Sequence, residues 1–253
     1  MKYVELTMST PEANLAGDEA LLDQCEEGRG EEVLRFWEPP GLFIVLGYSG
    51  RVEEEVNLAN WRCRPVPILR RCSGGGAVVQ GPGCLNYSLV LRILDTEAFS
   101  SIVKTNACIT QRHQAALTPV LGPTLTVQGS TDLALGTLKF SGNSQRRRRQ
   151  FVLFHGTFLL NFDLEQIETL LSHPPRQPYY RQHRAHRDFV TNLKIAPDRI
   201  KEALKTCWKA TCELDTVPLE AIRQLAREKY SSPGWRIDPR HPPSVLPPSA
   251  NAP

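Results

Sequence analysis

The spacing of apolar residues predicts a helix near the start of the chain. Thr10 precedes a proline and an acid, an order typical of a helix start, because threonine caps free amide groups and the acid favours the helix dipole. Leu15, Leu22 and Cys25 then share one helical face, as expected of a helix that packs on a core. We expect this helix to end near Gly28.

Strand-like stretches follow. Residues 33–37 and 42–46 are separated by Pro39-Pro40-Gly41, and this arrangement predicts a β-hairpin. The acidic stretch 52–61 predicts one short helix, and a strand is expected to end at Leu69. A further helix is predicted over residues 99–117. Additional strands are predicted at 77–80, 87–93, 124–127, 132–135 and 151–161.

The closing part of the chain predicts two amphipathic helices and a tail. Pro197 and Pro218 each stand where a first helical turn begins, and apolar residues follow both at helical spacing. Residues 238–253 are rich in Pro, Ser and Asn, so we expect a disordered tail after a single catalytic domain spanning 1–237. Strands and helices mix without regular alternation, which predicts an α+β domain with a mixed β-sheet flanked by helices.

Composition excludes several classes of protein. With 253 residues, 41% hydrophobic and 23% charged, the chain can bury a core. A net charge of +3 is too small to indicate nucleic-acid binding but permits an acidic protein partner. The first twenty residues contain four acids, unlike a secretory signal, and the longest apolar run, 42–46, is too short to cross a membrane. We therefore expect a cytoplasmic protein.

The seven cysteines are scattered without a CxxC pair. This distribution fits reduced thiols better than disulfides or a zinc site.

The segment Arg70–Val79 reads RRCSGGGAVV. Its three consecutive glycines let backbone amides approach a ligand closely, and the arginines add charge for a phosphate or carboxylate. A flexible turn between strands is the competing interpretation. Neither a Walker A motif nor a dinucleotide fingerprint is matched.

A second segment, GTLKFSGNSQ at residues 136–145, places Lys139 in a strand-like run. Alternation puts Lys139 on the face opposite Leu138 and Phe140, where it could point into a cleft, although strand lysines usually lie in solvent. After a basic turn, the sequence continues with HGTFLLN from His155.

Together, RRCSGGGAVVQGPGCLNYS, GTLKFSGNSQRRRR and HGTFLLNFDL resemble, in order and spacing, the motifs of the lipoate-protein ligase A and octanoyltransferase family. The opening helix with Asn14 and Asp18-Glu19-Ala20-Leu21, and the strand Arg35-Phe36-Trp37 before Leu46-Gly47, are similar as well. The resemblance covers roughly residues 5–195. Biotin ligases, which are broader relatives, have a different arrangement of arginines.

The resemblance implies a class II aminoacyl-tRNA synthetase-like and biotin synthetase-like fold with one elongated pocket for acyl group and nucleotide. Lys139 matches the catalytic lysine that stabilises charge on the reacting acyl carbonyl and phosphate. The other residues that match substrate- or nucleotide-binding positions are Arg71, Ser73, Gly74, Gly75, Gly76, Ala77, Val78, Asn86, Asp132, Ser141, Gly142, His155, Gly156 and Thr157.

The chemistry implied by a ligase begins with activation of an acid. Lipoate or octanoate would attack ATP, with Mg²⁺ neutralising the phosphates, to give an acyl-adenylate and pyrophosphate. A lysine of a lipoyl carrier domain would then attack the mixed anhydride. Ligases of the best-known type carry a C-terminal accessory domain, of which residues 219–235 are at most a remnant, so a separate accessory subunit is a possible partner.

Two alternatives stay open. An octanoyltransferase of this fold would form a cysteine thioester with octanoate from acyl carrier protein, without ATP. No cysteine lies between Cys108 and Cys207, where one type of family acyltransferase carries its nucleophile, and Cys72 and Cys84 lie among small or apolar residues. The other alternative is a non-catalytic module that binds a lipoyl domain.

Two basic segments lie outside these motifs. Arg146 to Arg149 is expected to cap a hairpin in water, or else to steer an acidic carrier domain toward the pocket. RNA binding by this run is disfavoured because no aromatic platform accompanies it. The segment 176–192, rich in Arg, His and Tyr, is expected to be a loop near the pocket mouth, and its His183 and His186 lack further metal ligands at suitable spacing.

Overall fold

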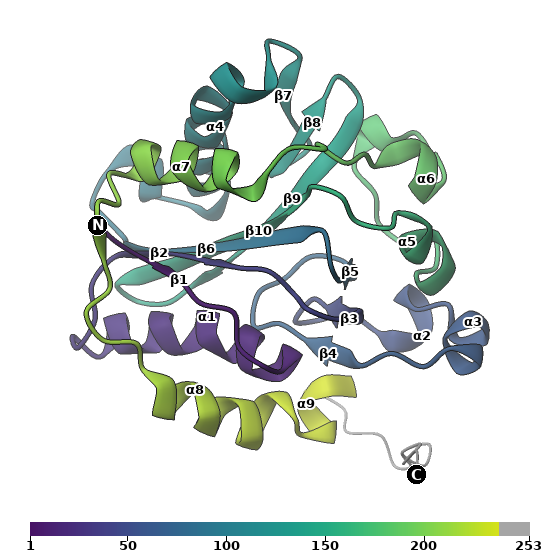
Figure 1. Ribbon diagram of the computed structural model, residues 1–253, viewed down its shortest axis with the longest axis horizontal. Coiled ribbons are helices and arrows are strands. Elements are labelled where there is room, and N and C mark those ends of the chain that lie inside the picture. Colours follow the sequence, from purple (N-terminus) through teal and green to yellow (C-terminus); the bar gives the residue numbers. More distant parts are fainter. Residues whose placement is uncertain (238–253) are drawn as a thin grey trace.

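The computed structural model describes residues 1–237, and the predicted tail 238–253 lies outside the described residues. An eight-stranded mixed sheet runs through the centre of the molecule (Figure 1). Its strands, in spatial order, are β11 (Cys212–Glu213), β1 (Lys2–Glu5), β2 (Val33–Trp37), β6 (Cys84–Arg92), β10 (Phe151–Leu159), β9 (Leu138–Arg147), β8 (Asp132–Leu135) and β7 (Leu125–Gln128).

A second, three-stranded sheet lies beside the first. Its spatial order is β4 (Ile68–Arg70), β3 (Phe43–Leu46) and β5 (Val78–Gln80), with β3 and β4 parallel and β3 and β5 antiparallel. The segment between β4 and β5 is the glycine-rich stretch, so this small sheet fixes both ends of that loop.

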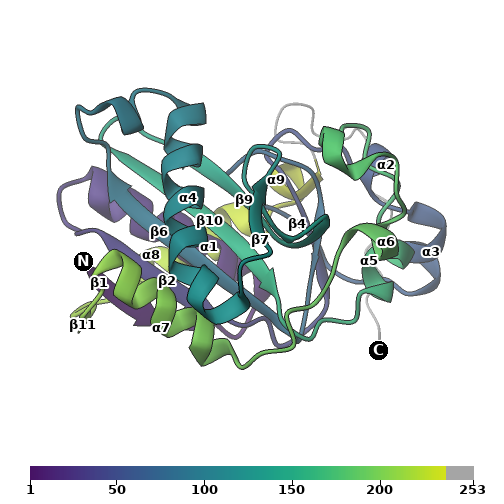
Figure 2. The same ribbon diagram turned by 90° about the horizontal axis from the view of Figure 1, so that it is seen from above.

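Helices cover both faces of the large sheet. Figures 1 and 2 show α4 (Ile102–Leu121) and α7 (Pro197–Trp208) on one face and α1 (Pro11–Glu26) on the other, with α8 (Leu219–Leu225) outside α1. A third group lies beside the small sheet: α2 (Val52–Glu55), α3 (Leu58–Cys63), α5 (Glu165–Leu170) and α6 (His186–Phe189). The remaining short helices are η1 (Glu97–Phe99), η2 (Tyr179–Arg181), the π-helical η3 (Ala226–Tyr230) and α9 (Pro233–Ile237).

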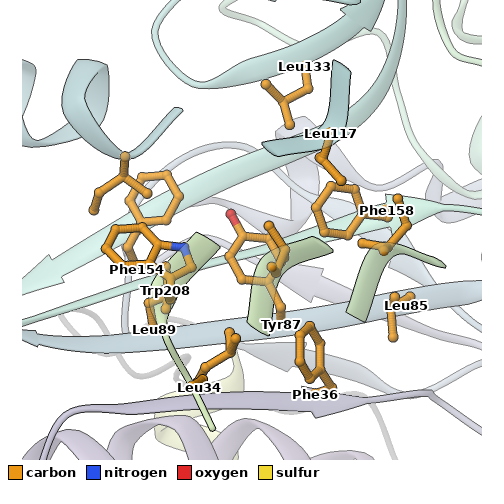
Figure 3. Packing of buried hydrophobic residues seen from close by; sticks show 14 of the residues in the cluster. Leu34, Phe36, Leu85, Tyr87, Leu89, Leu117, Leu133, Phe154, Phe158 and Trp208 are labelled. Carbon is orange, nitrogen blue, oxygen red and sulfur yellow. The ribbon is translucent and has the colours of Figure 1, made fainter. Parts of the chain in front are cut away.

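The main core fills the space between the large sheet and the α4–α7 layer. Figure 3 shows Tyr87 of β6 between Phe36 below and Phe158 and Leu117 above. Trp208 of α7 closes one side of this cluster, where its indole nitrogen donates to His113. No helix among residues 1–237 is long and apolar enough to cross a membrane.

Most predicted elements are confirmed within a few residues. The first helix is capped by Thr10, whose side chain accepts from the Ala13 amide at 3.2 Å, and it buries the predicted face of Leu15, Leu22 and Cys25. Both closing helices begin at or directly after their prolines. The cysteines of the described region are all free, as predicted.

The predicted hairpin of residues 33–37 and 42–46 is wrong. β2 pairs with β1 and β6 in the large sheet, whereas β3 pairs with β4 and β5 in the small one. Both edges of β2 are therefore hydrogen-bonded to other strands, so β2 cannot pair with β3. The segment containing Pro39 and Pro40 carries the chain from one sheet to the other instead of reversing it, and Trp37 and Phe43 pack in one apolar cluster.

The single helix predicted for 52–61 is also wrong. Val56 is extended, with φ of −106° and ψ of 132°, and it separates α2 from α3. Val56 is buried and forms a β-bridge to Leu171, and the Asn57 side chain caps α3 by accepting from the Asn60 amide. Tertiary pairing therefore overrides the local helical preference.

Candidate active site

A cavity of about 560 Å³ lies between the large sheet, the glycine-rich loop and residues 172–190. A larger hollow of about 680 Å³ between α4 and α7 contains none of the predicted site residues. The smaller cavity is the candidate site because convergent polar groups line it beside an apolar part, as in most small-molecule sites. The apolar lining includes Leu15, Trp37, Val45, Val79, Leu159, Ile167, Leu171, Phe189 and Val190.

The floor of the cavity is the sheet face opposite the core of Figure 3. In β6, the core residues Leu85, Tyr87 and Leu89 alternate with Asn86 and Ser88. Successive side chains of a strand point to opposite faces. The sequence of β6 therefore builds an apolar core on one side and a polar floor on the other.

The neighbouring strand β10 completes this floor. His155 pairs with Ser88 and Thr157 with Asn86 across the antiparallel ladder. Thr157 Oγ1 donates to Asn86 Oδ1 at 2.5 Å, Asn86 Nδ2 donates to Gln80 Oε1 at 2.9 Å, and Gln80 Nε2 donates back to Thr157 at 2.7 Å. This closed ring satisfies each partner and fixes the floor in one arrangement.

Lys139 lines the cavity from β9, next to an irregularity in that strand. Lys139 lies opposite Ala134 of β8, and Ser141 lies opposite Leu133, so β9 accommodates Phe140 as an extra residue. Phe140 is buried in the core, while the Lys139 amine lies over Gly142. Lys139 is therefore on the face opposite Phe140, as predicted.

A carboxylate holds the Lys139 amine in place. Lys139 Nζ lies 2.8 Å from Asp132 Oδ1, and Tyr180 Oη donates to the other oxygen, Asp132 Oδ2, at 2.8 Å. Gly142 makes room for this arrangement, since a Cβ there would lie 2.9 Å from Lys139 Nζ. The Lys139 side chain is only partly exposed, so its amine lies inside the cavity and away from bulk solvent.

The glycine-rich loop is shaped by Arg71. Its guanidinium donates from Nε to the Gly74 carbonyl at 3.1 Å and from Nη2 to the Gly76 carbonyl at 3.0 Å. Burial lowers the pKa of Arg71 to about 10, which leaves it charged at neutral pH. Gly47 packs directly on the loop, because a Cβ there would fall 1.8 Å from the Gly75 carbonyl oxygen.

Two further side chains secure the loop from opposite sides. The Glu55 carboxylate accepts from the Ala77 amide, and Ser144 Oγ of β9 donates to the Gly74 carbonyl at 2.9 Å. Glu55 and Ser144 both line the cavity. The loop thus connects the small sheet to the strand that carries Lys139.

A buried relay joins the loop to the first helix. Ser73 Oγ lies 2.5 Å from His155 Nε2, and His155 Nδ1 lies 2.9 Å from Asp18 Oδ2. Asp18 is 2% exposed, and its other oxygen accepts from Arg35 at 2.7 Å and Ser88 at 2.9 Å. Burial opposes ionisation of Asp18, but the hydrogen bond with His155 and the charge of Arg35 outweigh it and lower its pKa. The relay fixes Ser73 and the orientation of the His155 ring.

Residues 174–190 form one wall of the cavity, as predicted for a loop near its mouth. Arg181 is 4% exposed and lines the cavity, and its Nη2 has no hydrogen-bond partner among residues 1–237. The guanidinium lies over the Phe189 ring at 4.9 Å, and Arg181 Nε donates to the Arg184 carbonyl. A buried, unsatisfied cation at a cavity wall fits an anionic ligand.

The structure brings most of the predicted site residues together. Those that line the cavity are Arg71, Gly75, Gly76, Ala77, Val78, Asn86, Asp132, Lys139, Ser141, Gly142, His155, Gly156 and Thr157. Ser73 and Gly74 do not line it, because Ser73 is buried against His155 and Gly74 is turned toward Arg71 and Ser144. The binding and catalytic roles of all these residues stay predictions.

Several lining residues are not among the site residues predicted from the sequence, and they include the polar residues Asp18, Glu55, Gln80 and Arg181. Asp18 is part of a recognised segment, so its buried charge in an otherwise apolar helix face was an available signal. Arg181 belongs to the segment 176–192 that is expected near the pocket mouth, whereas Glu55 and Gln80 have no local signal because distant partners determine their positions.

No cysteine lines the cavity among the described residues. Cys72 and Cys84 are both buried, and burial raises the pKa of each thiol to about 12. Both therefore stay protonated at neutral pH and are poor nucleophiles. Within residues 1–237 no group of three His, Cys, Asp or Glu side chains could hold a metal ion.

The four-arginine run lies at the far end of β9, where it reaches the turn into β10. Arg147 donates to the Phe99 carbonyl at 2.6 Å, Arg148 pairs with Asp23 at 2.9 Å, and Arg146 lies over the Tyr48 ring at 5.5 Å. Only Arg149 is exposed. The run does cap a hairpin, but the prediction that it does so in water holds for Arg149 alone.

Comparison with known proteins shows similarity across most of the chain. A model of the lipoyl protein ligase A/B catalytic domain matches residues 10–207. The chain is 30% identical to a putative lipoate-protein ligase A of Aeropyrum pernix, over 92% of this chain and 90% of that protein. It is 26% identical to the octanoyltransferase LipM of Geobacillus kaustophilus, over 93% of this chain and 97% of that protein.

The fold is also similar to that of a solved structure from Thermoplasma acidophilum, described as a bi-partite lipoate protein ligase and its E2 lipoyl domain. The TM-score is 0.77 at 23% sequence identity, and the match covers 97% of this chain and 100% of that one. The predicted mixed sheet flanked by helices is thereby confirmed.

Proposed function

Because the chain belongs to the family of lipoyl protein ligase A/B catalytic domains, we propose that it is a lipoate-protein ligase. It would activate lipoate or octanoate with ATP and transfer the acyl group to a lysine of a lipoyl carrier domain. One observation carries the proposal: the Lys139 amine and the glycine-rich loop line one cavity that has an apolar part and, among residues 1–237, no thiol.

The apolar part of the cavity suits a medium-length acyl chain. Leu15, Trp37 and Val45 line it near α1, and Leu159 and Ile167 line it near α5. Burial of an acyl chain against such side chains is favourable by about 0.8 kcal/mol per methylene. The carboxylate would then lie toward the polar part, within reach of Lys139.

The polar part suits the phosphates of a nucleotide. Arg181 offers a buried Nη2 that has no hydrogen-bond partner among residues 1–237. In the glycine-rich loop, Gly75 and Gly76 have no Cβ, so a ligand can approach the backbone amides closely. Asp132 would supply a carboxylate ligand to Mg²⁺, which usually binds through one or two carboxylates together with phosphates and water. The ion would neutralise phosphate charge when bound.

The chain's own residues account for two steps, an adenylyl transfer followed by an acyl transfer. In the first, a carboxylate oxygen of the acid bonds to the α-phosphorus of ATP and pyrophosphate leaves. The Lys139 ammonium and the Arg181 guanidinium would stabilise the negative charge that grows on the phosphate oxygens. In the second, the acceptor lysine attacks the acyl carbonyl and AMP leaves, and Lys139 would stabilise the developing oxyanion.

The cysteines favour the ligase over the octanoyltransferase. A thioester mechanism needs a thiolate beside the acyl chain, and the described cysteines that flank the glycine-rich loop are buried with raised pKa values. The relatives include proteins of both names, so the distinction rests on this geometry.

The partners proposed are a lipoyl carrier domain and, for full activity, a separate accessory subunit. The solved structure from Thermoplasma acidophilum is described as a bi-partite lipoate protein ligase and its E2 lipoyl domain, and the match covers the whole of the matched chain. A cytoplasmic location, the absence of nucleic-acid and membrane partners, and the domain boundary at residue 237 stay predictions from the sequence.

The experiment that tests the function is exchange of labelled pyrophosphate into ATP, run with lipoate and octanoate. We expect acid-dependent exchange that falls about 100-fold or more in Lys139→Ala, since charge stabilisation of a transition state has that magnitude. Lys104→Ala is the control, because Lys104 is an exposed lysine paired only with Glu97. No exchange, together with an octanoyl adduct in intact mass spectra after mixing with octanoyl-acyl carrier protein, would favour the transferase.

A further inference from the structure

A strongly basic segment lies at the mouth of the cavity. Residues 173–187, here called the basic rim, contain four arginines and three histidines and no acid. The whole chain has a formal net charge of only +3. Positive charge is therefore concentrated at the entrance to the candidate site.

The basic rim is anchored to the strand that carries Lys139. Val190 forms a parallel β-bridge with Lys139, and the Thr191 amide donates to the Lys139 carbonyl at 2.9 Å. Arg184 Nη2 donates to the Thr137 carbonyl at 3.1 Å. A molecule bound on this rim would thus lie next to the reacting end of the cavity.

Several cations of the rim are not neutralised. Arg176 and Arg187 are exposed and form no ion pair within residues 1–237. The nearby carboxylate of Glu168 accepts from the backbone amides of His186 and Arg187 instead of pairing with a guanidinium. Free guanidinium groups at a protein surface attract an acidic partner.

An aromatic side chain stands on the same surface. Tyr179 is 93% exposed, the highest value among the large hydrophobic residues that are exposed in the described region. Its neighbourhood is held by Gln177, whose side chain accepts from the His183 amide at 2.9 Å and contacts the His183 ring. An exposed tyrosine beside arginines is the composition typical of binding hot spots.

The other basic cluster does not have these properties. Arg146, Arg147 and Arg148 are engaged with Tyr48, Phe99, Asp23 and Glu19. Arg147 is eight residues from Lys139 along β9, a separation of about 26 Å for an extended strand. Figure 1 shows α6 and the β9–β10 turn at opposite ends of the sheet.

We propose that the basic rim docks the acidic face of the protein domain that carries the acceptor lysine. The inference rests on the proposed function, because it names the surface at which that function meets its protein substrate. Docking there brings the acceptor lysine to the mouth of the cavity beside Lys139. Attraction between the rim and an acidic face also raises the association rate, an effect that salt screens.

The test uses the full chain and an unmodified E2 lipoyl domain with acidic residues around its acceptor lysine. Arg187→Glu and Tyr179→Ala change rim residues that do not line the cavity. We expect each variant to lower kcat/KM for the lipoyl domain about tenfold or more, and to leave pyrophosphate exchange unchanged. The dependence of kcat/KM on salt should weaken in Arg187→Glu.

Arg149→Glu is the matched control, because Arg149 is the exposed arginine of the other cluster. Equal losses in Arg149→Glu and Arg187→Glu would overturn the proposal, since only net charge would then matter. Unchanged transfer in both rim variants would also overturn it, as would an equal loss of exchange and transfer, which would identify the rim as a nucleotide site.

Direct binding separates this proposal from the proposed function. Calorimetry of the full chain with the lipoyl domain should show weaker binding for Arg187→Glu and normal binding for Arg149→Glu. If the wild-type chain lacks exchange but shows this pattern, the ligase proposal fails and the docking surface stands. If exchange is present and the pattern is absent, only the docking surface fails.

Discussion

At the scale of single residues, the position of the Lys139 amine depends on the residue beneath it. Gly142→Ala would place a methyl group 2.9 Å from Lys139 Nζ and Cε. The side-chain end is flexible, so we expect the amine to shift away from Asp132 without a loss of stability. A misplacement of about 1 Å at a reacting centre can lower the rate by about 100-fold, so we expect kcat to fall by up to that amount.

The measurement is single-turnover kinetics of acyl-adenylate formation, together with thermal unfolding. Gly41→Ala is the control, since a Cβ at Gly41 meets nothing within 4 Å. A Gly142→Ala variant with normal kcat would show that the Lys139–Asp132 geometry is not needed for the reaction.

The Asp18 relay makes a prediction about stability and pH. Asp18→Asn leaves the Arg35 guanidinium buried without its ion-pair partner, a change that costs about 3 kcal/mol of unfolding free energy at pH 7. The pKa of Asp18 is lowered in the folded protein, so its stabilising contribution is complete above the ordinary carboxyl range. That contribution is lost as the pH falls through the lowered value.

Urea unfolding at a series of pH values checks this prediction. The difference between wild type and Asp18→Asn should be largest near neutral pH and should shrink at the acid end. A constant difference at all pH values would show that Asp18 acts by packing and not by charge.

At the scale of elements, the glycine-rich loop is supported from the C-terminal end of the described chain. Arg70 of β4 is fully buried and donates to the carbonyls of Gly47, Gly50 and Trp235. Trp235 Nε1 donates back to the Arg70 carbonyl at 2.9 Å. Helix α9 therefore holds the strand from which the loop begins.

Trp235→Ala should weaken this support. It removes the ring contacts to Tyr48 and Tyr230 and one hydrogen bond, and we expect about 2 kcal/mol lower stability with a raised KM for ATP. Arg227→Ala is the control, because Arg227 is exposed and its one ion pair in the described region is with the exposed Glu228. Chemical denaturation and steady-state kinetics measure both effects, and a normal KM in Trp235→Ala would separate α9 from the site.

The sequence predicts these elements better than their pairing. Thr10 and Pro197 mark helix starts through local chemistry, and the alternation in β6 reflects its two faces. The double-proline turn after Trp37 gives no such guide, because strand partners are chosen by distant residues. For the same reason α2 and α3 are divided by a bridge from Val56 to Leu171 that local propensity does not contain.

The candidate site also combines residues that local motifs identify with residues that only tertiary contacts bring together. Lys139 and the glycine-rich loop belong to contiguous motifs, so the resemblance to a family identified them. The relay from Asp18 to His155 joins residues 137 positions apart, and Gln80 enters the floor only through its contacts with β6 and β10. Arg181 stands out because its buried Nη2 has no hydrogen-bond partner in the described region, and this can be recognised only from the structure around it.

At the scale of the whole molecule, both ends of the described chain are tied into one body. The N-terminal strand β1 pairs with β11, which follows α7 in the chain. Tyr230 of η3 donates to the buried Glu19 of α1 at 2.9 Å. Lys229 also pairs with Glu19, at 2.7 Å. The region after α7, which the sequence suggests is at most a remnant of an accessory domain, packs on α1 of the main body.

This packing predicts different outcomes for two truncations. A chain that ends at Ile237 keeps the contacts of α8, η3 and α9 with α1 and β4, so we expect an unchanged midpoint of thermal unfolding and unchanged pyrophosphate exchange. A chain that ends at Pro218 exposes the apolar cluster around Leu15 and Phe43 and removes Lys229 and Tyr230, two of the side chains that contact the buried Glu19 carboxylate. We expect it to lose at least about 4 kcal/mol of stability.

Thermal unfolding, urea unfolding and exchange activity of the two truncated chains distinguish these outcomes. Loss of activity on removal of residues 238–253 alone would place part of the function outside the domain 1–237. Full stability of the chain that ends at Pro218 would mean that the C-terminal helices are an appended unit. Lys229 and Tyr230 of η3 contact the buried Glu19 carboxylate, and Trp235 of α9 contacts Arg70 of β4, so we expect the stability of the domain to depend on the residues between Pro218 and Ile237.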